Sequence, residues 1–252
     1  MILLLNAANR DAFPALLDDM FHARHEVFVE GRGWEELRSP DGRDIDARDD
    51  AAAVYLLALD GDRVLAGARL TGAEGPTLAA EMLPELFETA PPSGPDILEM
   101  SRLFARSETA VRDLLSPAVS EVLVAAVELA RIVGARGILS LFDLRLAQIL
   151  LAWGGHPEPL GLPRRARDGV TVAVLNHATP LAARNLRKAR RLGRPAVWWA
   201  DSPSDTPRPY PDILRADPLD PDWTAPGDGS ALQRAGMAPH ALAEAYWRDR
   251  LA

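Results

Sequence analysis

The 252-residue sequence contains no cysteine, and only one of its 28 basic residues is a lysine. The absence of cysteine excludes disulfide bonds, thiolate metal sites and a cysteine nucleophile. No apolar run approaches the roughly 20 residues that span a bilayer. The first apolar run, Ile2–Leu5, is too short for the core of a signal peptide. We therefore expect a cytoplasmic protein that makes no membrane contact.

The overall composition is that of a globular protein. Hydrophobic residues make up 48% of the chain and charged residues 25%, which excludes a mainly disordered or fibrous chain. The net charge of −8 argues against general binding of nucleic acid. The length suits one large α/β domain, or one domain with an appendage.

The charge is distributed unevenly along the chain. Residues 164–194 include nine basic residues and one acid, whereas residues 201–252 include nine acids and five arginines. A genome that favours arginine codons explains the scarcity of lysine, but it does not explain this clustering. The basic stretch is either a solvated helix face or a surface that attracts an acidic partner.

The hydrophobic pattern predicts alternating helices and strands. Apolar residues recur at helical spacing over Asp11–Val29. The runs Val54–Leu59 and Val64–Leu70 flank Gly61-Asp62 and predict a β-hairpin. This order favours an α/β or α+β fold with a mixed, twisted sheet flanked by helices. The later elements that we expect are strands at Asp96–Ala105, Ile138–Phe142 and Val170–Leu175, and helices at Ser116–Val133, Asp143–Trp153 and Thr179–Leu192.

The character of the chain changes near residue 195. Residues 195–252 contain nine of the 21 prolines and four of the six tryptophans. Proline alone is typical of a linker, but the tryptophans favour packing against the domain or a partner. We therefore divide the chain into a domain at 1–194 and a Pro/Trp-rich C-terminal extension at 195–252, which ends in a short helix at Met237–Leu251.

Several charged residues stand where the apolar pattern predicts burial. Arg24 shares a helix face with Phe28, because the two are four positions apart. Buried charges are costly unless they are paired. Two interpretations remain open, a structural ion-pair network or a cleft that binds a charged ligand. We expect three arginines to balance three carboxylates: Arg24, Arg69 and Arg102 against Asp46, Asp49 and Glu99.

These residues belong to an ordered set of motifs. The set consists of Arg24-His-Glu-Val-Phe28, Gly33-Trp34, Asp46-Ala-Arg-Asp49, Gly67-Ala-Arg69-Leu70, Met82-Leu83 with Phe87, and Glu99-Met-Ser-Arg102. In order and interval it resembles the autoinducer synthases, which make N-acyl-homoserine lactones for bacterial quorum sensing. The resemblance is strong from Met20 to Phe104, weaker to Gly161, and absent from 195–252.

The resemblance implies an acyltransferase of the GNAT-like fold. The acyl donor would be a thioester of acyl carrier protein or of coenzyme A. The acceptor would be S-adenosylmethionine, which is a substrate, so no cofactor is implied. Its amine would attack the thioester, and its carboxylate would then close the lactone and release 5′-methylthioadenosine.

The family's site residues carry over to this chain. The amine needs a base, for which Glu99 is the first choice because its apolar strand raises the pKa of a carboxyl group; Asp46 is the alternative. Arg24, Phe28 and Trp34 would form the wall of the S-adenosylmethionine site, where Trp34 offers a cation–π contact to the sulfonium. The remaining members of the expected substrate site are Asp44, Asp49, Arg69, Phe87 and Arg102.

Regular strand geometry would separate two of these site residues. In a regular strand Glu99 and Arg102 lie on opposite faces. A β-bulge near Met100–Ser101 would bring both to one side. GNAT-like folds carry such a bulge at the corresponding strand, so we predict one here.

The acyl chain needs an apolar pocket, which the elements after residue 116 supply. Ser140 aligns with a position where relatives that accept 3-oxo groups carry threonine, and serine leaves that preference open. Ordinary core packing is the alternative for every lining residue. The pocket residues that we expect are Met100, Leu123, Ser140, Leu141, Phe142 and Leu146.

The basic stretch offers a docking site for an acidic acyl carrier protein. Where GNAT enzymes usually carry a Gly-rich phosphate loop, this chain reads Arg106-Ser-Glu-Thr-Ala, which weakens coenzyme A as donor without excluding it. The residues of this expected carrier-protein patch are Arg164, Arg165, Arg167, Arg187, Arg190 and Arg191.

Other functions remain open beside the leading one. The chain is alternatively a GNAT-type N-acyltransferase with another amine acceptor, or a non-catalytic binder of acyl carrier protein. No metal is expected, because His22 and His25 have no third ligand nearby.

Overall fold

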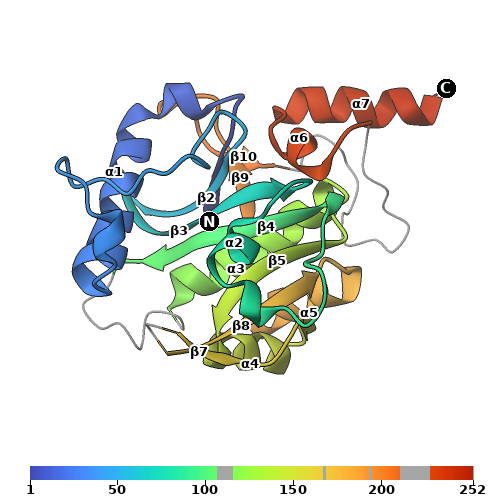
Figure 1. The fold of residues 1–252 in the computed structure, drawn as a ribbon. Helices are drawn as coiled ribbons and strands as arrows, with labels where there is room; N and C mark the ends of the chain where they lie inside the picture. The colour runs from blue at the N-terminus through green and yellow to red at the C-terminus, as the bar shows by residue number, and fades with distance from the viewer. Residues whose placement is uncertain (107–115, 167–168, 193–194, 211–227, 252) are drawn as a thin grey trace.

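The computed structural model describes residues 1–106, 116–166, 169–192, 195–210 and 228–251. Its centre is a ten-stranded mixed sheet in the order β10-β9-β1-β2-β3-β4-β5-β8-β6, with β7 paired to β8 (Figure 1). The strands are β1 Ile2–Leu5, β2 Val54–Asp60, β3 Arg63–Ala73, β4 Gly94–Ala105, β5 Gly137–Asp143, β6 Pro157–Pro159, β7 Arg164–Ala166, β8 Gly169–His177, β9 Val197–Trp199 and β10 Arg208–Pro209.

Helices cover both faces of this sheet. The α-helices are α1 Pro14–His25, α2 Leu78–Met82, α3 Pro117–Ile132, α4 Leu144–Ala152, α5 Pro180–Ala189, α6 Ala231–Ala235 and α7 Pro239–Leu251. Short 3-10 turns lie at Arg10–Ala12, Glu35–Leu37 and Pro84–Leu86, and a π-helical turn at Glu26–Gly31 continues α1.

Side-chain alternation in the strands assigns a different partner to each face. In β2, Leu56 packs in the large core cluster that contains α3, whereas Tyr55 and Leu57 pack in the cluster that contains α1. A third cluster, which includes Ile97 and Leu139, lies on the side of β4 and β5 that faces away from α3. The central strands are therefore buried on both faces, as their continuous apolar runs predict.

The expected elements are confirmed, with small differences at their ends. Ser116 caps α3 by accepting a hydrogen bond from the Val119 N–H group, and Pro117 occupies the first helical position. Gly61 adopts a positive φ of 56° in the hairpin turn between β2 and β3. The strand β1 was not predicted, because the short apolar run Ile2–Leu5 has no turn signal or partner strand beside it in the sequence.

The predicted β-bulge is confirmed, directly after the expected position. Gly67 pairs with Phe104 and Arg69 with Ser101, so β4 has one residue more than β3 between these pairs. Arg102 in this bulge has a φ of 51°, which is unfavourable for a residue with a Cβ atom. The parallel pairing of β4 with β5 reaches only to Met100 opposite Ser140. The sheet therefore changes its regular course at the residues that the site requires.

The segment after residue 194 adds strands to the same sheet. β9 pairs in parallel with β1, and β10 pairs with β9. Trp199 and Tyr210 are buried in the large core cluster, and the Tyr210 hydroxyl donates to the Met237 carbonyl at 3.0 Å. Asn6, just after β1, donates to the Ala235 carbonyl at 2.7 Å. Helices α6 and α7 follow at one end of the sheet (Figure 1).

Within the described part of the chain, no helix has both the length and the apolar character that are required to cross a membrane.

Candidate active site

A closed ring of alternating charges lies between α1, the loop before β2, and strands β3 and β4. Arg24 reaches it from α1, Arg69 from β3 and Arg102 from the bulge of β4. The carboxylates come from the loop between Gly42 and Val54, which has no regular secondary structure. The ring consists in order of Arg24, Asp44, Arg102, Asp46, Arg69 and Asp49, which pairs again with Arg24.

Each arginine contacts two carboxylates in this ring. Arg24 lies 3.0 Å from Asp44 and 2.7 Å from Asp49. Arg102 lies 2.7 Å from Asp44 and 3.1 Å from Asp46. Arg69 lies 2.5 Å from Asp46 and 3.0 Å from Asp49. Three positive charges thus meet three negative charges, so the ring is neutral and each buried ion is paired.

Solvent reaches this ring at one edge. The side chain of Asp46 is 25% exposed and that of Arg102 is 9% exposed, whereas the other four members are at most 1% exposed. Asp46 and Arg102 are therefore the members that a ligand contacts first.

One expected pairing is wrong, because Asp44 takes the place of Glu99. The Glu99 carboxylate accepts hydrogen bonds from the backbone N–H groups of Leu78 at 2.9 Å and Ala79 at 2.7 Å. Both donors belong to the first turn of α2, whose backbone N–H groups have no partner within the helix. Glu99, which is 1% exposed, therefore connects β4 to α2 through these two hydrogen bonds and does not take part in the ring.

Burial and charge pairing move the pKa values of the acids in opposite directions. Burial alone would raise the pKa of Asp49, but hydrogen bonds and charge attraction from Arg24 and Arg69 hold it at about 2. Asp46 likewise keeps a lowered pKa, since its contacts with Arg69 outweigh its burial. For Glu99, burial raises the pKa and the two backbone N–H groups offset this only in part. Of Asp46, Asp49 and Glu99, Glu99 therefore takes up a proton most readily.

Two stacked aromatic rings border the open edge. Phe28 lies in the π-helical turn, and its ring stacks on Trp34 with 5.0 Å between centroids. The guanidinium of Arg102 lies 5.7 Å from the centre of the Phe28 ring. Gly33 takes a positive φ of 68°, which turns the chain between the two aromatics. Aromatic faces attract cations, so this wall suits a positively charged ligand group.

The segment that carries α2 and Phe87 lies over the Glu99 side of the sheet. Phe87 packs against the cluster of Ile97 and Leu139. Arg48, two residues after Asp46, donates to the Pro76 carbonyl and forms an ion pair with Glu81 at 2.6 Å. The loop that supplies the ring carboxylates is therefore tied to the segment that Glu99 holds.

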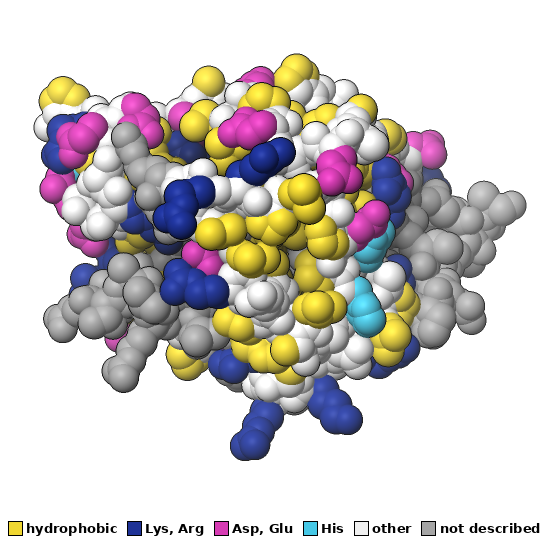
Figure 2. Space-filling model, turned by 60° about the horizontal axis from the view of Figure 1, so that its bottom comes forward, with side chains coloured by type: hydrophobic (Ala, Val, Ile, Leu, Met, Phe, Trp, Pro, Cys, Tyr) yellow, Lys and Arg dark blue, Asp and Glu magenta, His cyan; other side chains and the backbone are white. Residues whose placement is uncertain are grey.

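The expected carrier-protein patch comes from two separate elements, β7 and the end of α5. Two of its arginines have partners within the chain: Arg187 lies 3.3 Å from Glu128, and the Arg190 guanidinium lies 5.1 Å from the centre of the Trp153 ring. Figure 2 shows a face on which Lys and Arg side chains are dispersed around an apolar area. Of the other predicted members, Arg164, Arg165 and Arg191 are exposed, and Arg167 lies outside the described residues.

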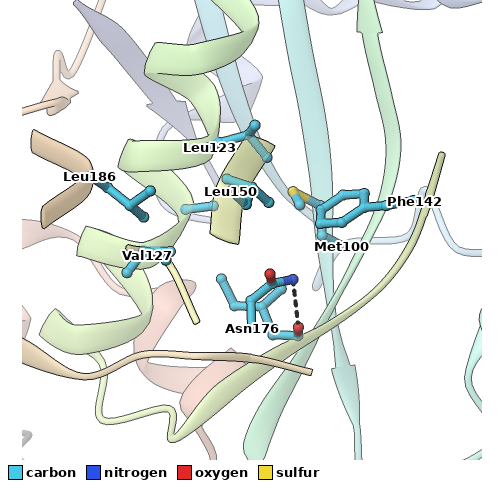
Figure 3. Close-up of a pocket in the computed structure, with 10 residues that line it drawn as sticks. Met100, Leu123, Val127, Phe142, Leu150, Asn176 and Leu186 are labelled. Atoms are coloured by element: carbon cyan, nitrogen blue, oxygen red, sulfur yellow. Dashed lines mark hydrogen bonds between the residues drawn. The ribbon is translucent and has the colours of Figure 1, made fainter. Parts of the chain in front are cut away.

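A cavity of about 10 Å³ lies between α3, β4, β5 and β8 (Figure 3). Met100, Leu123 and Phe142 line it, as expected for the acyl pocket. A cavity of this volume holds about one water molecule. A larger group would enter only if lining side chains moved, and the flexible Met100 is the lining residue that adapts most easily.

The other three expected pocket residues do not line this cavity. Leu146 is buried in the surrounding core. Ser140 is fully buried and accepts a hydrogen bond from Asn176 at 3.3 Å. Leu141 packs with the cluster of Leu139 on the opposite face of β5, because strand neighbours alternate.

Four residues that shape the site were not predicted from the sequence. Ser101 accepts a hydrogen bond from Arg69 at 3.1 Å, and Tyr55 donates to Asp49 at 3.0 Å. Arg48 joins two loops, as described above, and Asn176 lines the cavity. For Asn176 a signal was present, since alternation from Val174 places this amide on the side of β8 that faces the core.

The chain is similar in sequence to known homoserine-lactone synthases. The family model for autoinducer synthases matches residues 10–178. An isovaleryl-homoserine lactone synthase of Bradyrhizobium diazoefficiens is 35% identical over 212 residues, which cover 81% of this chain and 90% of the relative. An acyl-homoserine-lactone synthase of Acinetobacter nosocomialis is 33% identical over 147 residues, which cover 56% and 80% of the two chains.

Solved structures of such enzymes share the fold. The CoA-dependent acyl-homoserine lactone synthase BjaI, determined with MTA and with SAM and isopentyl-CoA, aligns with a TM-score of 0.70 at 30% identity, over 87% of this chain and 96% of its own. The CoA-dependent synthase MesI aligns with a TM-score of 0.70 at 30% identity, over 78% and 98%. The α/β fold expected from the sequence, with a mixed sheet flanked by helices, is confirmed.

Proposed function

The chain belongs to the autoinducer synthase family of acyltransferases, and we propose that it makes an N-acyl-homoserine lactone from S-adenosylmethionine and an acyl-coenzyme A. The observation that carries this proposal is the neutral Arg/Asp ring, which is open to solvent only at Asp46 and Arg102 and has the stacked Phe28 and Trp34 at its edge. Five charged residues that match the family motifs lie in this ring, and Glu99 lies on the same strand as one of them, Arg102. The five are Arg24, Asp46, Asp49, Arg69 and Arg102.

Such a site suits the charges of S-adenosylmethionine. The substrate carries a sulfonium, an ammonium and a carboxylate. We place the sulfonium at the aromatic face of Trp34, because the guanidinium groups of Arg32 and Arg102 already lie 5.2 Å and 5.7 Å from the centre of the Phe28 ring. The ammonium then faces Asp46 and the carboxylate faces Arg102, the two charged groups that solvent reaches.

Glu99 is the base that this site supports best. Asp46 already contacts two arginines, and its lowered pKa makes it a weak proton acceptor. The pKa of Glu99 is raised by burial, which suits a general base that works near neutral pH. A carboxylate offers about four lone-pair positions, of which the Leu78 and Ala79 N–H groups use two. Glu99 therefore retains sites for a proton, taken directly or through a water molecule.

The reaction then has two bond exchanges. The substrate ammonium gives one proton to the base, and the resulting amine attacks the thioester carbonyl. A C–N bond forms, the C–S bond breaks, and coenzyme A leaves as its thiol after its thiolate takes the second proton of the nitrogen. The substrate carboxylate next attacks its own Cγ. A C–O bond forms, the bond from Cγ to the sulfonium breaks, and 5′-methylthioadenosine leaves with the electron pair.

Coenzyme A is the donor carrier that we favour over acyl carrier protein. Two similar solved structures are of synthases described as CoA-dependent, and one holds isopentyl-CoA. The expected carrier-protein patch supports the same choice, because Arg187 and Arg190 already contact Glu128 and Trp153. An acidic carrier protein is attracted most strongly by a continuous area of positive charge.

The test is to incubate the purified protein with S-adenosylmethionine and matched acyl thioesters of coenzyme A and of acyl carrier protein. Mass spectrometry of the products is the readout. We expect acyl-homoserine lactone with the coenzyme A thioesters, at a higher kcat/KM than with the carrier-protein thioesters. The reverse order would overturn the proposed donor only. An acylated amine other than homoserine lactone, or carrier-protein binding without turnover, would overturn the proposed function itself.

A further inference from the structure

A single amide interrupts the apolar wall of the cavity. Asn176 lies in β8 opposite Ile138 of β5 and is 6% exposed. Neighbouring positions on its face of β8 are occupied by apolar residues such as Val174. Figure 3 shows the amide pointing into the space between Val127, Leu150 and Met100. Burying a polar group in an apolar wall costs free energy unless the group forms hydrogen bonds.

The orientation of this amide is fixed by two acceptors. The Nδ2 group donates to the Ile138 carbonyl at 3.3 Å and to Ser140 Oγ at 3.3 Å. Only an NH₂ group can face a carbonyl oxygen, so the amide cannot turn around. Both N–H bonds are thereby used, and Ser140 acts as a positioning residue for the amide.

The Asn176 amide oxygen is the atom of this side chain that is available to a ligand. Within the described part of the chain, the Asn176 side chain makes no hydrogen bond besides the two that Nδ2 donates. The oxygen is an acceptor and therefore needs a donor. The space beside it is about 10 Å³ and matches a group the size of a water molecule.

We propose that Asn176 selects an acyl group that carries a hydroxyl, which donates its hydrogen bond to Asn176 Oδ1. This proposal rests on the proposed function and names its acyl substrate class. A keto oxygen can only accept, so it would face another acceptor. An unsubstituted chain would bury the amide oxygen with no donor, which is unfavourable. An ammonium would supply donors, but its burial costs far more than that of a hydroxyl.

The first test uses the unaltered enzyme and a series of acyl-coenzyme A thioesters of equal chain length. The series contains the unsubstituted chain, the 3-oxo chain, and the 2-, 3-, 4- and ω-hydroxy chains. Release of methylthioadenosine gives kcat/KM for each. We expect one hydroxy isomer to exceed both the unsubstituted and the 3-oxo chain by about tenfold or more, as expected when a buried acceptor gains its donor.

The second test removes the amide. Asn176→Leu keeps the approximate shape of the side chain and makes the cavity wall apolar. We therefore expect the preference for the hydroxy isomer to vanish and kcat/KM for the unsubstituted chain to increase. Val127→Ala, which enlarges the same cavity without touching the amide, is the matched control. We expect it to change the kcat/KM of both chains while their ratio stays in favour of the hydroxy isomer. Circular dichroism of both variants establishes that they fold.

The outcomes separate this inference from the proposed function. Equal kcat/KM for hydroxylated and unsubstituted chains, or a hydroxyl preference that survives Asn176→Leu, would overturn the role of Asn176 and leave the synthase activity standing. If no thioester on either carrier releases methylthioadenosine, the proposed function fails and the inference fails with it.

Discussion

Three arginines and three aspartates are tolerated in the interior because each ion has two partners of opposite charge. Asp49 is fully buried between Arg24 and Arg69, and it also accepts a hydrogen bond from Tyr55. Coulomb attraction is strong at these distances in a partly desolvated site. Removing one member leaves buried charges with fewer partners, so the ring stabilises the fold only as a whole.

We expect Asp49→Asn to lower the free energy of unfolding at pH 7 by about 3–5 kcal/mol, because Arg24 and Arg69 each lose a carboxylate partner. Urea unfolding is the measurement. Asp62→Asn in the exposed hairpin turn is the control, and we expect it to change stability little. A loss no larger than that of the control would contradict the account of the ring.

Asp49 also makes the stability of the folded protein depend on pH. The pKa of Asp49 falls from 3.8 to about 2 on folding, so its ionised form stabilises the folded state above about pH 4. This contribution of about 2 kcal/mol is lost as the pH falls from about 4 to about 2. We expect the stability of the unaltered protein to fall more steeply over this range than that of Asp49→Asn. Parallel slopes would show that Asp49 is not the titrating group.

Glu99 is predicted to act as the base, which a pH profile can test. Since burial raises its pKa, kcat/KM should rise as the pH passes through that value and the carboxylate forms. We expect Glu99→Gln to lower kcat/KM by about 10²–10⁴-fold and to abolish this rise. A variant that retains both the activity and the rise would exclude Glu99 as the base.

At the scale of the elements, local patterns predicted most of the fold. The periodicity of Ser116–Val133 and the hairpin at Gly61 are confirmed, since both depend on neighbours in sequence. The bulge was predictable because strand alternation otherwise separates Glu99 from Arg102, but its position was not. Strand β1 was missed because four apolar residues alone indicate burial without indicating a partner.

The short helix α2 is held by Glu99 and by its own cap, so its cap should affect activity. Thr77 caps α2 by accepting from the Ala80 N–H group, and Thr179 caps α5 in the same way from Ala182. Each Thr→Ala change should cost about 1 kcal/mol of stability. We expect only Thr77→Ala to lower kcat/KM, because only α2 contacts Glu99. Equal kinetics for the two variants would contradict a role of α2 at the site.

The variants Thr77→Ala and Thr179→Ala also serve as controls for the Glu99→Gln experiment. Glutamine retains only one acceptor oxygen, so Glu99→Gln loosens α2 as well as removing the base. An activity loss far beyond that of Thr77→Ala is expected for a base. A loss equal to that of Thr77→Ala would assign Glu99 a positioning role only.

For the whole molecule, the sequence predicted the members of the charged ring but not how they pair. Asp44 meets Arg24 and Arg102 because an irregular loop brings it there, and no spacing rule describes such a loop. Leu141 is a different case, because alternation with Ser140 would have excluded it from the pocket. Residues beyond the family match also enter the core, as Trp199 does.

Substitutions in strand β9 test how much the segment after residue 194 contributes to the stability of the fold. Trp199 is fully buried against Tyr210, whereas its neighbour Trp198 is half-buried. We expect Trp199→Ala to lower the free energy of unfolding by about 3–5 kcal/mol, and Trp198→Ala to lower it by much less. Chemical unfolding at one pH compares the two. Equal effects would contradict the assignment of Trp199 to the common core.

The central claim is that one site couples acyl transfer to lactone formation on S-adenosylmethionine. The most direct measurement is the amount of free coenzyme A thiol and of 5′-methylthioadenosine formed in the same reaction. Each turnover as described releases one of each, so we predict equal amounts throughout the time course, with the unaltered enzyme and its best acyl-coenzyme A. Thiol release without methylthioadenosine would contradict the account, because it would show acyl transfer to another acceptor or to water.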